Sequence, residues 1–381
     1  MRDILISTAG TSLLFNIKNN ILNSSNDKYS NIKKYFVSNE SKNMAEGLCQ
    51  IADTDRVCGA EINSVEAILS QGLLNERFYH FILVSDTQEG QIVGNTLLNY
   101  YSEPFNKKNR FQNVKIHKVD GLNSDNAKRF KNEGLKNLVR LIVSVVRNYG
   151  SERILINATG GYKAQISFAG MIGQALCIPV CYMFEGFNEV ITLPPQPLSF
   201  DFEFWLQYYE IFSQIDNNPN NMIEFDKKWE LPDDRFDALV DYIQGDGKYI
   251  YELTPTGLLF HETFRSRFKS KKELLPADSQ IPIQERKIVY EDKNANKHKG
   301  LPKYLEKILK ASFVNRIYIY YYNRDLEKQN IFRRTEDDKI SEIDGWYSND
   351  GAITKFTVRT TAETLQQRNA AIAWLNESFA S

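Results

Sequence analysis

The sequence predicts an α/β fold, with a doubly wound parallel sheet over residues 1–200 and smaller modules after it. Short apolar runs typical of strands alternate with longer segments of helical periodicity, as in successive strand–helix–strand units. Three of the strand-like runs lead into loops rich in Gly, Ser, Thr and Asn, and the proline-rich stretch TLPPQPLSFD at 192–201 ends the series. In such a sheet the carboxyl ends of the strands carry the ligand site.

The elements of this first region follow one another regularly. The predicted strands are DILIST (3–8), HFILVSD (80–86), VKIHKV (114–119), RILINA (153–158) and IPVCYMFEG (178–186). The predicted helices are TQEGQIVGNTLLNYY (87–101), about 125–149 and 162–176. The second of these helices has apolar residues at helical spacing, which are Leu135, Leu138, Leu141, Ile142 and Val145.

Composition limits the class of protein. With 381 residues, two or three domains are expected. The net charge of −1 neither favours nor disfavours nucleic acid, so any basic surface must be local. The four cysteines form no C-x2-C pair, which disfavours a zinc site or a disulfide framework. No leader peptide and no apolar run of about 18 residues is recognisable, so we expect a cytoplasmic protein without a membrane partner.

Three further segments follow the first domain at 1–200. Residues 201–275 predict a small winged-helix-like module, because a β-like run, a Thr-Pro turn and an amphipathic helix follow one another. Residues 276–300 are expected to be a polar linker. Residues 301–381 predict a small α+β domain, with a helix at 301–313, short strands, and a terminal amphipathic helix whose stripe is Leu365, Ile372, Leu375 and Phe379.

Three loops should meet at the carboxyl edge of the first sheet. They are STAGTSLLFN (7–16), SDTQEG (85–90) and NATGGYK (157–163). Glycine allows close backbone approach, hydroxyls donate, helix N-termini attract anions and Lys163 adds a charge, so the loops suit a phosphate or nucleotide ligand. The dinucleotide fingerprint G-x-G-x-x-G is absent after the first strand and no P-loop motif exists, which disfavours dehydrogenases and P-loop NTPases.

The segments LISTAGTSLLFN, LVSDTQEG and INATGGYKAQISFAGMIGQALCIPVCYMFEGFNEVITLPP together resemble the CRISPR-associated Rossmann-fold sensors, the CARF domains. The resemblance covers about residues 1–200 and implies a Rossmann-like sheet. Members of that family form homodimers and bind cyclic oligoadenylates made by type III CRISPR complexes. The resemblance therefore implies a two-fold homodimer around a cyclic tetra-adenylate, a ligand with matching symmetry.

The resemblance also indicates which residues would hold this ligand, an allosteric activator. The turn from Asn157 to Lys163 would form half of a cradle for the phosphodiester ring. The expected contacts are Thr8, Gly10, Thr11, Ser12, Ser85, Asp86, Thr87, Asn157, Thr159, Gly160, Gly161 and Lys163.

The last domain has strands with an unusual outer face. In NRIYIYYYNRD, alternation places Arg316, Tyr318, Tyr320, Tyr322 and Arg324 on one side. In ITKFTVR, Lys355, Thr357 and Arg359 lie opposite Thr354, Phe356 and Val358. Cations for phosphates and aromatic rings for bases suit RNA, although a solvated charged face explains the pattern equally well.

Two nuclease classes have sequence signatures that this domain lacks or matches only loosely. The HEPN ribonucleases that often accompany such sensors need an arginine four to six residues before a histidine, and no histidine follows His298. A metal-dependent nuclease needs clustered acids and a lysine, which Asp325, Asp337 and Lys339 supply only loosely. The segment around Asp337 suits a polar hairpin turn better.

The order helix, short basic strands, terminal helix is similar to that of RelE-type messenger-RNA interferases. This resemblance implies RNA cleavage without a metal or other catalytic cofactor, by attack of a ribose 2′-OH on the adjacent phosphate, with Lys and Arg stabilising the developing charge. The candidate catalytic residues are Arg324, Arg333, Lys355 and Arg359, with Arg334 and Arg368 behind them. The general acid and base stay unassigned.

The sequence therefore predicts a cyclic-tetra-adenylate-activated endoribonuclease of type III CRISPR defence that cleaves messenger RNA on the ribosome. Two alternatives stay open. One is a metal-dependent nuclease at Asp325, Asp337 and Lys339. The other is a transcription regulator without nuclease activity, because PTGLLFHETFRSRFKSKK (255–272) has five Lys or Arg in its second half and resembles a DNA-recognition helix.

Overall fold

A computed structural model of the chain describes residues 2–22, 26–37, 40–106, 108, 110–184, 187–196, 201–218, 222–225, 232–245, 247–268, 272–324, 326 and 330–380. The chain divides into two compact units. The first unit comprises Met1–Phe200, Pro232–Asp241 and Thr254–Phe260. The second unit comprises Asp201–Leu231, Tyr242–Leu253 and His261–Ser381.

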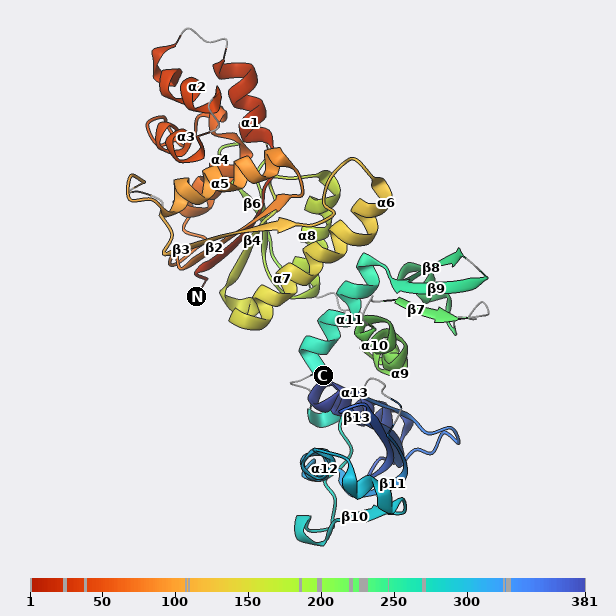
Figure 1. The fold of residues 1–381 in the computed structure, drawn as a ribbon. Coiled ribbons are helices and arrows are strands. Elements are labelled where there is room, and N and C mark those ends of the chain that lie inside the picture. The colour runs from red at the N-terminus through yellow and green to blue at the C-terminus, as the bar shows by residue number, and fades with distance from the viewer. Residues whose placement is uncertain are drawn as a thin grey trace. The chain divides into compact units, whose positions relative to one another are not determined.

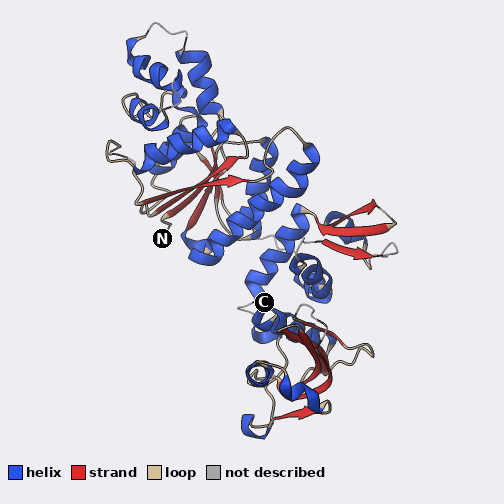
Figure 2. Ribbon diagram, viewed as in Figure 1, coloured by secondary structure: helices blue, strands red, loops and turns tan. Residues whose placement is uncertain are grey.

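The first unit is built on a six-stranded sheet, visible at the centre of its helices in Figure 2. Its strands are β1 (Ile4–Thr8), β2 (Tyr79–Ser85), β3 (Asn113–Val119), β4 (Ile154–Asn157), β5 (Val180–Tyr182) and β6 (Ile191–Leu193). The order is β3-β2-β1-β4-β5-β6, and all neighbours are parallel except β5 and β6. The chain thus winds outward from β1 in both directions, which confirms the predicted doubly wound, Rossmann-like α/β sheet.

Helices cover both faces of this sheet, and every residue of β1 is buried (Figure 1). They are α1 (Ser12–Asn16), α2 (Ser30–Val37), α3 (Ser41–Leu48), α4 (Gly59–Ser70), α5 (Gln88–Ser102), α6 (Ala127–Arg129), α7 (Leu135–Tyr149) and α8 (Lys163–Ala175). The expected helix at 125–149 is α6 and α7, joined through a π-helical turn at Phe130–Gly134. Helices α1 to α4 fill the segment between β1 and β2, for which the sequence made no assignment.

The middle of the chain forms three helices and a small sheet. The helices are α9 (Phe202–Gln207), α10 (Tyr209–Asn217) and α11 (Pro255–Phe268). The sheet has the order β7-β9-β8, with β7 at Met222–Phe225, β8 at Val240–Gly245 and β9 at Lys248–Leu253. Asp201 begins α9 by accepting a hydrogen bond from the Phe204 amide. The winged-helix-like character of this region stays a prediction.

The C-terminal part of the second unit is a five-stranded sheet of order β10-β11-β14-β13-β12. Its elements are β10 (Lys287–Tyr290), α12 (Leu301–Leu309), β11 (Val314–Asn323), β12 (Ile331–Arg334), β13 (Glu342–Asn349), β14 (Ala352–Thr360) and α13 (Leu365–Phe379). Strand β10 pairs parallel with β11 and lies in the segment expected to be a polar linker. The other pairs are antiparallel.

Both helices pack on one face of this sheet. The Tyr304 ring of α12 lies 6.3 Å from that of Phe356, and the Phe379 ring of α13 lies 6.5 Å from that of Phe332. Ile372 and Leu375 of α13 are buried as expected, but Leu365 is 53% exposed and lies outside the apolar stripe. No helix in the described part of the chain is long and apolar enough to cross a membrane.

A bulge in β11 changes the predicted alternation of its side chains. The register with β14 shifts between Ile319 and Tyr321, so Tyr321 pairs with Lys355 and Tyr322 pairs with Thr354. An extra residue in one strand moves every later side chain to the opposite face. Tyr321, rather than Tyr322, therefore shares the outer face with Lys355.

Candidate functional site

The three polar loops of the first unit lie side by side at the carboxyl edge of its sheet. Strand β1 pairs with β2 on one side and with β4 on the other, and all three strands run in the same direction. The loops that follow them are therefore neighbours, as the sequence predicts.

Glycines allow two of these loops to touch. A Cβ atom on Gly10 would lie 2.8 Å from the amide nitrogen of Gly161, and one on Gly160 would lie 2.9 Å from the Thr8 carbonyl oxygen. The buried Thr8 hydroxyl donates a 2.5 Å hydrogen bond to the Gly160 carbonyl. Gly161 has φ = +108°, which favours glycine. Gly10, Gly160 and Thr8 thus join the loops to each other.

Glu61 of α4 organises the first loop, and the sequence analysis missed it. Its buried carboxylate accepts hydrogen bonds from the Gly10 amide, at 3.1 Å, and from the Ser12 hydroxyl, at 2.5 Å. The Ser12 hydroxyl in turn accepts one from the Ala60 amide. Gly10 and Ser12 are predicted ligand residues. In the structure the Gly10 amide and the Ser12 hydroxyl both donate to Glu61, and their contact with a ligand stays a prediction.

Asn157 and Thr159 hold the third loop together. The Asn157 side chain is 1% exposed and donates to the Ser64 hydroxyl at 2.8 Å. Its Oδ1 accepts from the Thr159 hydroxyl at 2.7 Å, and the same hydroxyl accepts from the Met183 amide. The structure therefore buries Asn157 beneath the loop, where it holds Thr159 in place, and its own contact with a ligand stays a prediction.

The second loop is also held internally. Ser85 is buried, and Thr87 caps α5 by accepting from the Gly90 amide. Asp86 accepts a hydrogen bond from the Gly121 amide and pairs with Lys118 at 2.9 Å. The hydrogen bond from Lys118 lowers the pKa of Asp86 below its ordinary value. Asp86 is thus engaged within the protein, and its contact with a ligand stays a prediction.

Thr11 and Lys163 are the predicted ligand residues that the structure leaves exposed. Lys163 is the first residue of α8, so it stands at a helix N-terminus, where backbone amides favour an anion. Phe184 and Phe187, each 52% exposed, follow β5 at the same edge and form a ring pair 5.4 Å apart. The edge thus presents a cation, a hydroxyl and exposed aromatic rings, which suits the phosphates and bases of a nucleotide ligand.

The second candidate site is the outer face of the C-terminal sheet, opposite α12 and α13. The register aligns Lys355 of β14 with Tyr321 of β11 and with Trp346 of β13. One step along, Thr357 aligns with Tyr318 and with Asp344, and Asp344 aligns with Arg333 of β12. We call this surface the RNA face, after the substrate that the sequence analysis expects for it; its residues are Arg316, Tyr318, Tyr320, Tyr321, Arg333, Asp344, Trp346, Lys355, Thr357 and Arg359.

Cations and aromatic rings alternate across the RNA face. The Lys355 ammonium lies 5.0 Å from the Tyr321 ring centroid and 5.1 Å from that of Trp346. The Arg333 guanidinium lies 4.4 Å from the Trp346 ring. These distances are those of cation–π contacts, which hold the cations in place while their charge stays available.

Tyr318 lies between two guanidinium groups. Arg316 Nη1 donates to its phenol oxygen at 3.3 Å, and Arg359 also hydrogen-bonds it. The hydrogen bond from Arg316 lowers the pKa of Tyr318 below its ordinary value. Sequence reasoning placed Tyr318 on this face but did not assign it a role.

Asp344 is a nearly buried carboxyl group within the RNA face, 8% exposed, and the sequence analysis overlooked it. The Thr357 hydroxyl donates to its Oδ1 at 3.0 Å. Burial raises the pKa of Asp344, while the Thr357 hydrogen bond and the Arg333 charge oppose the shift. Burial also raises the pKa of neighbouring Tyr320 to about 12.

The six predicted catalytic cations do not all come together. Arg333, Lys355 and Arg359 share the RNA face. Arg324 follows the end of β11 at Asn323, whereas Arg359 pairs with Arg316 near the other end, so roughly 20 Å separates them along the strands. One phosphate cannot contact both.

The remaining two cations pair with other groups of the chain; Arg368 is buried, whereas an RNA contact of the half-exposed Arg334 stays a prediction. Arg334 points to α10 and pairs with Glu210 at 3.3 Å. Arg368 is 2% exposed, and its Nη1 donates to the Asp338 carbonyl and carboxylate. The Arg368 side chain therefore reaches neither solvent nor RNA. Its hydrogen bonds to Asp338 hold the turn between β12 and β13 in place.

The alternative metal-dependent site is an exposed turn. Asp337 pairs with Lys339 at 2.8 Å, and Lys339 also pairs with Glu342 at 3.4 Å. Asp325 lies outside the described residues. Within the ranges that the structure describes, no group of three or more His, Cys, Asp or Glu side chains is placed to hold a metal ion.

Part of the first unit matches the sequence model of one known protein family. Residues 56–196 match the model of a family described as CRISPR-associated protein (Cas_APE2256). That part of the chain, which includes β2 to β6, is therefore similar to a CRISPR-associated family. No curated protein matches the chain.

One solved structure with a likeness to the chain is Can2 from Sulfobacillus thermosulfidooxidans in complex with cyclic tetra-adenylate (cA4). The identity is 9% and the TM-score is 0.22. The match covers 71% of this chain and 64% of that chain, which is less than two thirds of its length.

Proposed function

We propose that this chain is an ancillary effector of type III CRISPR defence, in which a cyclic oligoadenylate bound to the first unit activates RNA cleavage on the second. The observation that carries the proposal is the RNA face, where Arg333, Lys355 and Arg359 lie among aromatic rings on the side of the sheet opposite both helices. The family match of residues 56–196 supports the CRISPR context.

The activator in this proposal is cyclic tetra-adenylate, bound at the carboxyl edge of the first sheet. Lys163 and the N-terminus of α8 would contact a phosphate, and the Thr11 hydroxyl would donate to another. The exposed Phe184 and Phe187 rings would stack on adenine. A homodimer would supply two such edges around one ring.

The reaction is transfer of a phosphodiester within the RNA. The 2′-oxygen loses its proton to a base and bonds to phosphorus, the bond to the 5′-oxygen breaks, and that oxygen gains a proton from an acid. The products are a 2′,3′-cyclic phosphate and a free 5′-hydroxyl. Arg333, Lys355 and Arg359 would stabilise the charge that develops on the phosphate.

Tyr318 is the candidate base on this face. Its neighbours Arg316 and Arg359 favour the phenolate, which accepts a proton. Asp344 is the candidate acid, because a carboxyl group with a raised pKa keeps its proton to a higher pH. Neither step requires a metal ion. The proposed location of this chemistry is the cytoplasm, on messenger RNA in the ribosome.

Cleavage assays with purified ribosomes and with naked RNA, each with and without cyclic tetra-adenylate and EDTA, test the function. We expect cleavage that depends on the cyclic ligand and persists in EDTA. Loss of cleavage in EDTA and recovery with Mg²⁺ on naked RNA would favour the metal-dependent alternative at Asp337. If naked RNA is cleaved at the same rate as messenger RNA bound to the ribosome, the dependence on ribosomes is refuted.

A further inference from the structure

Strand β12, which carries Arg333, is the edge strand of its sheet, and helices hold its free side. Asn376 of α13 accepts a 2.9 Å hydrogen bond from the Phe332 amide and donates one of 2.7 Å to the Phe332 carbonyl. Asn376 is 6% exposed. A buried side-chain amide therefore occupies the position that another strand would take.

Helix α10 holds β12 on the other side of Arg333. The Arg334 amide donates to Glu210 Oε1 at 2.8 Å, and Arg334 Nε donates to Oε2 at 3.3 Å. Arg333 thus lies between two residues, Phe332 and Arg334, whose backbones are bonded to α13 and α10. Its position on the RNA face depends on where these two helices lie.

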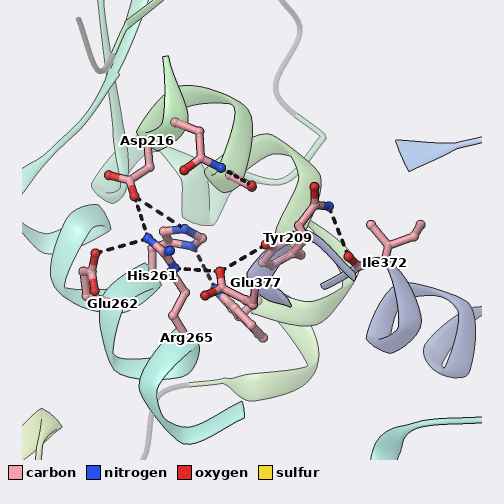
Figure 3. A network of polar contacts seen from close by, with 11 residues as sticks. Tyr209, Asp216, His261, Glu262, Arg265, Ile372 and Glu377 are labelled. Atoms are coloured by element: carbon pink, nitrogen blue, oxygen red, sulfur yellow. Dashed lines mark hydrogen bonds and ion pairs between the residues drawn. The ribbon is translucent and has the colours of Figure 1, made fainter. Parts of the chain in front are cut away.

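Arg265 of α11 ties α10 and α13 together (Figure 3). Its Nε donates to Glu377 of α13 at 2.7 Å, and its Nη1 donates to Asp216 of α10 at 3.0 Å. Glu377 also accepts from the Tyr209 hydroxyl of α10 at 3.2 Å. Glu377 is adjacent to Asn376 in the chain, so the group that holds α13 is next to the group that holds β12.

Helix α11 is continuous from the first unit into the second. Its residues up to Phe260 belong to the first unit, and those from His261 onward belong to the second. The buried His261 ring accepts a 3.0 Å hydrogen bond from Trp205 of α9, which fixes this half of the helix within the second unit.

We propose that Arg265 and Glu377 are positioning residues for Arg333, because they hold α10 and α13, the two helices that hydrogen-bond to β12 on either side of Arg333. The chemical role of Arg333 rests on the proposed function. The positioning of β12 rests only on the hydrogen bonds and ion pairs described here.

Glu377→Gln tests the coupling, because it keeps the shape of the side chain and leaves Asn376 intact. Ligand-activated cleavage is expected to fall about tenfold, as for a misplaced catalytic group. In an Arg333→Ala background the same change should have no further effect, because the two residues act through one position. Glu224→Gln, which removes one partner of the exposed pair between β7 and β9, is the matched control and should change neither rate.

Amide hydrogen exchange gives a second measurement that requires no nuclease activity. Exchange at Phe332 and Arg334 should rise in Glu377→Gln and remain unchanged in Glu224→Gln. If Glu377→Gln fails to fold, Glu210→Gln, which contacts β12 directly, takes its place. Unchanged exchange at both amides, or full additivity with Arg333→Ala, would overturn the proposal.

The two proposals fail in different ways. If no RNA is cleaved, or if Arg333→Ala cleaves normally, the proposed function fails, and the exchange measurement alone decides the positioning of β12. If calorimetry shows no binding of the cyclic ligand, the positioning of β12 is still tested by comparing amide exchange in Glu377→Gln with that in Glu224→Gln.

Discussion

Lys163 combines exposure with a helix N-terminus, and we expect it to contact a phosphate of the ligand. Lys163→Ala should lose about 1.5–3 kcal/mol per contact, which corresponds to at least about tenfold weaker binding. Titration calorimetry with cyclic tetra-adenylate measures this change. Lys115→Ala, on β3 beside the Tyr79 ring, is the control and should bind normally. Wild-type affinity in Lys163→Ala would remove the residue from the site.

Tyr318 and its two arginines predict a characteristic pH dependence of RNA cleavage. The rate should rise with pH as the phenol loses its proton, at a pH below its ordinary value because Arg316 lowers the pKa. Arg316→Ala removes that cation, so the rise should move to higher pH. Arg359→Ala should also lower the rate by roughly 10²–10³-fold, as expected when a cation that stabilises the transition state is removed. A profile unaffected by Arg316→Ala would exclude Tyr318 as the base.

The loops after β1 and β4 depend on glycine at their contact, and this gives a prediction at the level of elements. In Gly10→Ala the new methyl group would lie 2.8 Å from the Gly161 backbone nitrogen, so one loop must move. We expect a loss of about 1–3 kcal/mol in unfolding free energy, together with weaker ligand binding. Thermal and denaturant unfolding measure the first effect, and calorimetry measures the second.

Gly170 of α8 provides the matched control. A Cβ atom there would meet no atom within 4 Å. Gly170→Ala should therefore stabilise α8 by about 0.5–1 kcal/mol, as alanine does in a helix interior. Equal effects of the two substitutions would contradict the close contact between the loops.

At the scale of the whole molecule, a fall in pH should change the stability of the two units in opposite directions, because each unit buries one titratable group of a different kind. Burial lowers the pKa of His80 in the first unit from 6.5 to about 3. Between these values the unfolded chain binds a proton that the folded unit does not, so the first unit should lose roughly 5 kcal/mol of unfolding free energy as the pH falls through this range. Asp344 in the second unit has a raised pKa, so protonation on acidification favours its folded state.

Calorimetric unfolding between pH 7 and pH 4 checks this forecast. The transition of the first unit should move to lower temperature relative to that of the second. His80→Gln should remove most of the fall for the first unit, and Asp344→Asn should raise the stability of the second unit at pH 7. A fall in His80→Gln as steep as in the wild type would show that other groups cause it.

Sequence periodicity predicted much of the fold. The strands β1 to β5 and the helices α5, α7 and α8 follow from local patterns of apolar residues. The alternation of β14 placed Lys355, Thr357 and Arg359 together on one face, as the structure confirms. These features were predictable because the side-chain period of a strand or helix is a property of the local chain.

Tertiary structure decided which of these side chains are available for chemistry. Glu61 accepts hydrogen bonds from the Gly10 amide and the Ser12 hydroxyl. Arg368 is buried against the turn between β12 and β13. The bulge in β11 brings Tyr321 beside Lys355. Arg265 meets Glu377 across 112 residues of chain. Partners so distant leave no local periodic signal, because a hydrogen bond or ion pair depends on where the folded backbone brings two groups together.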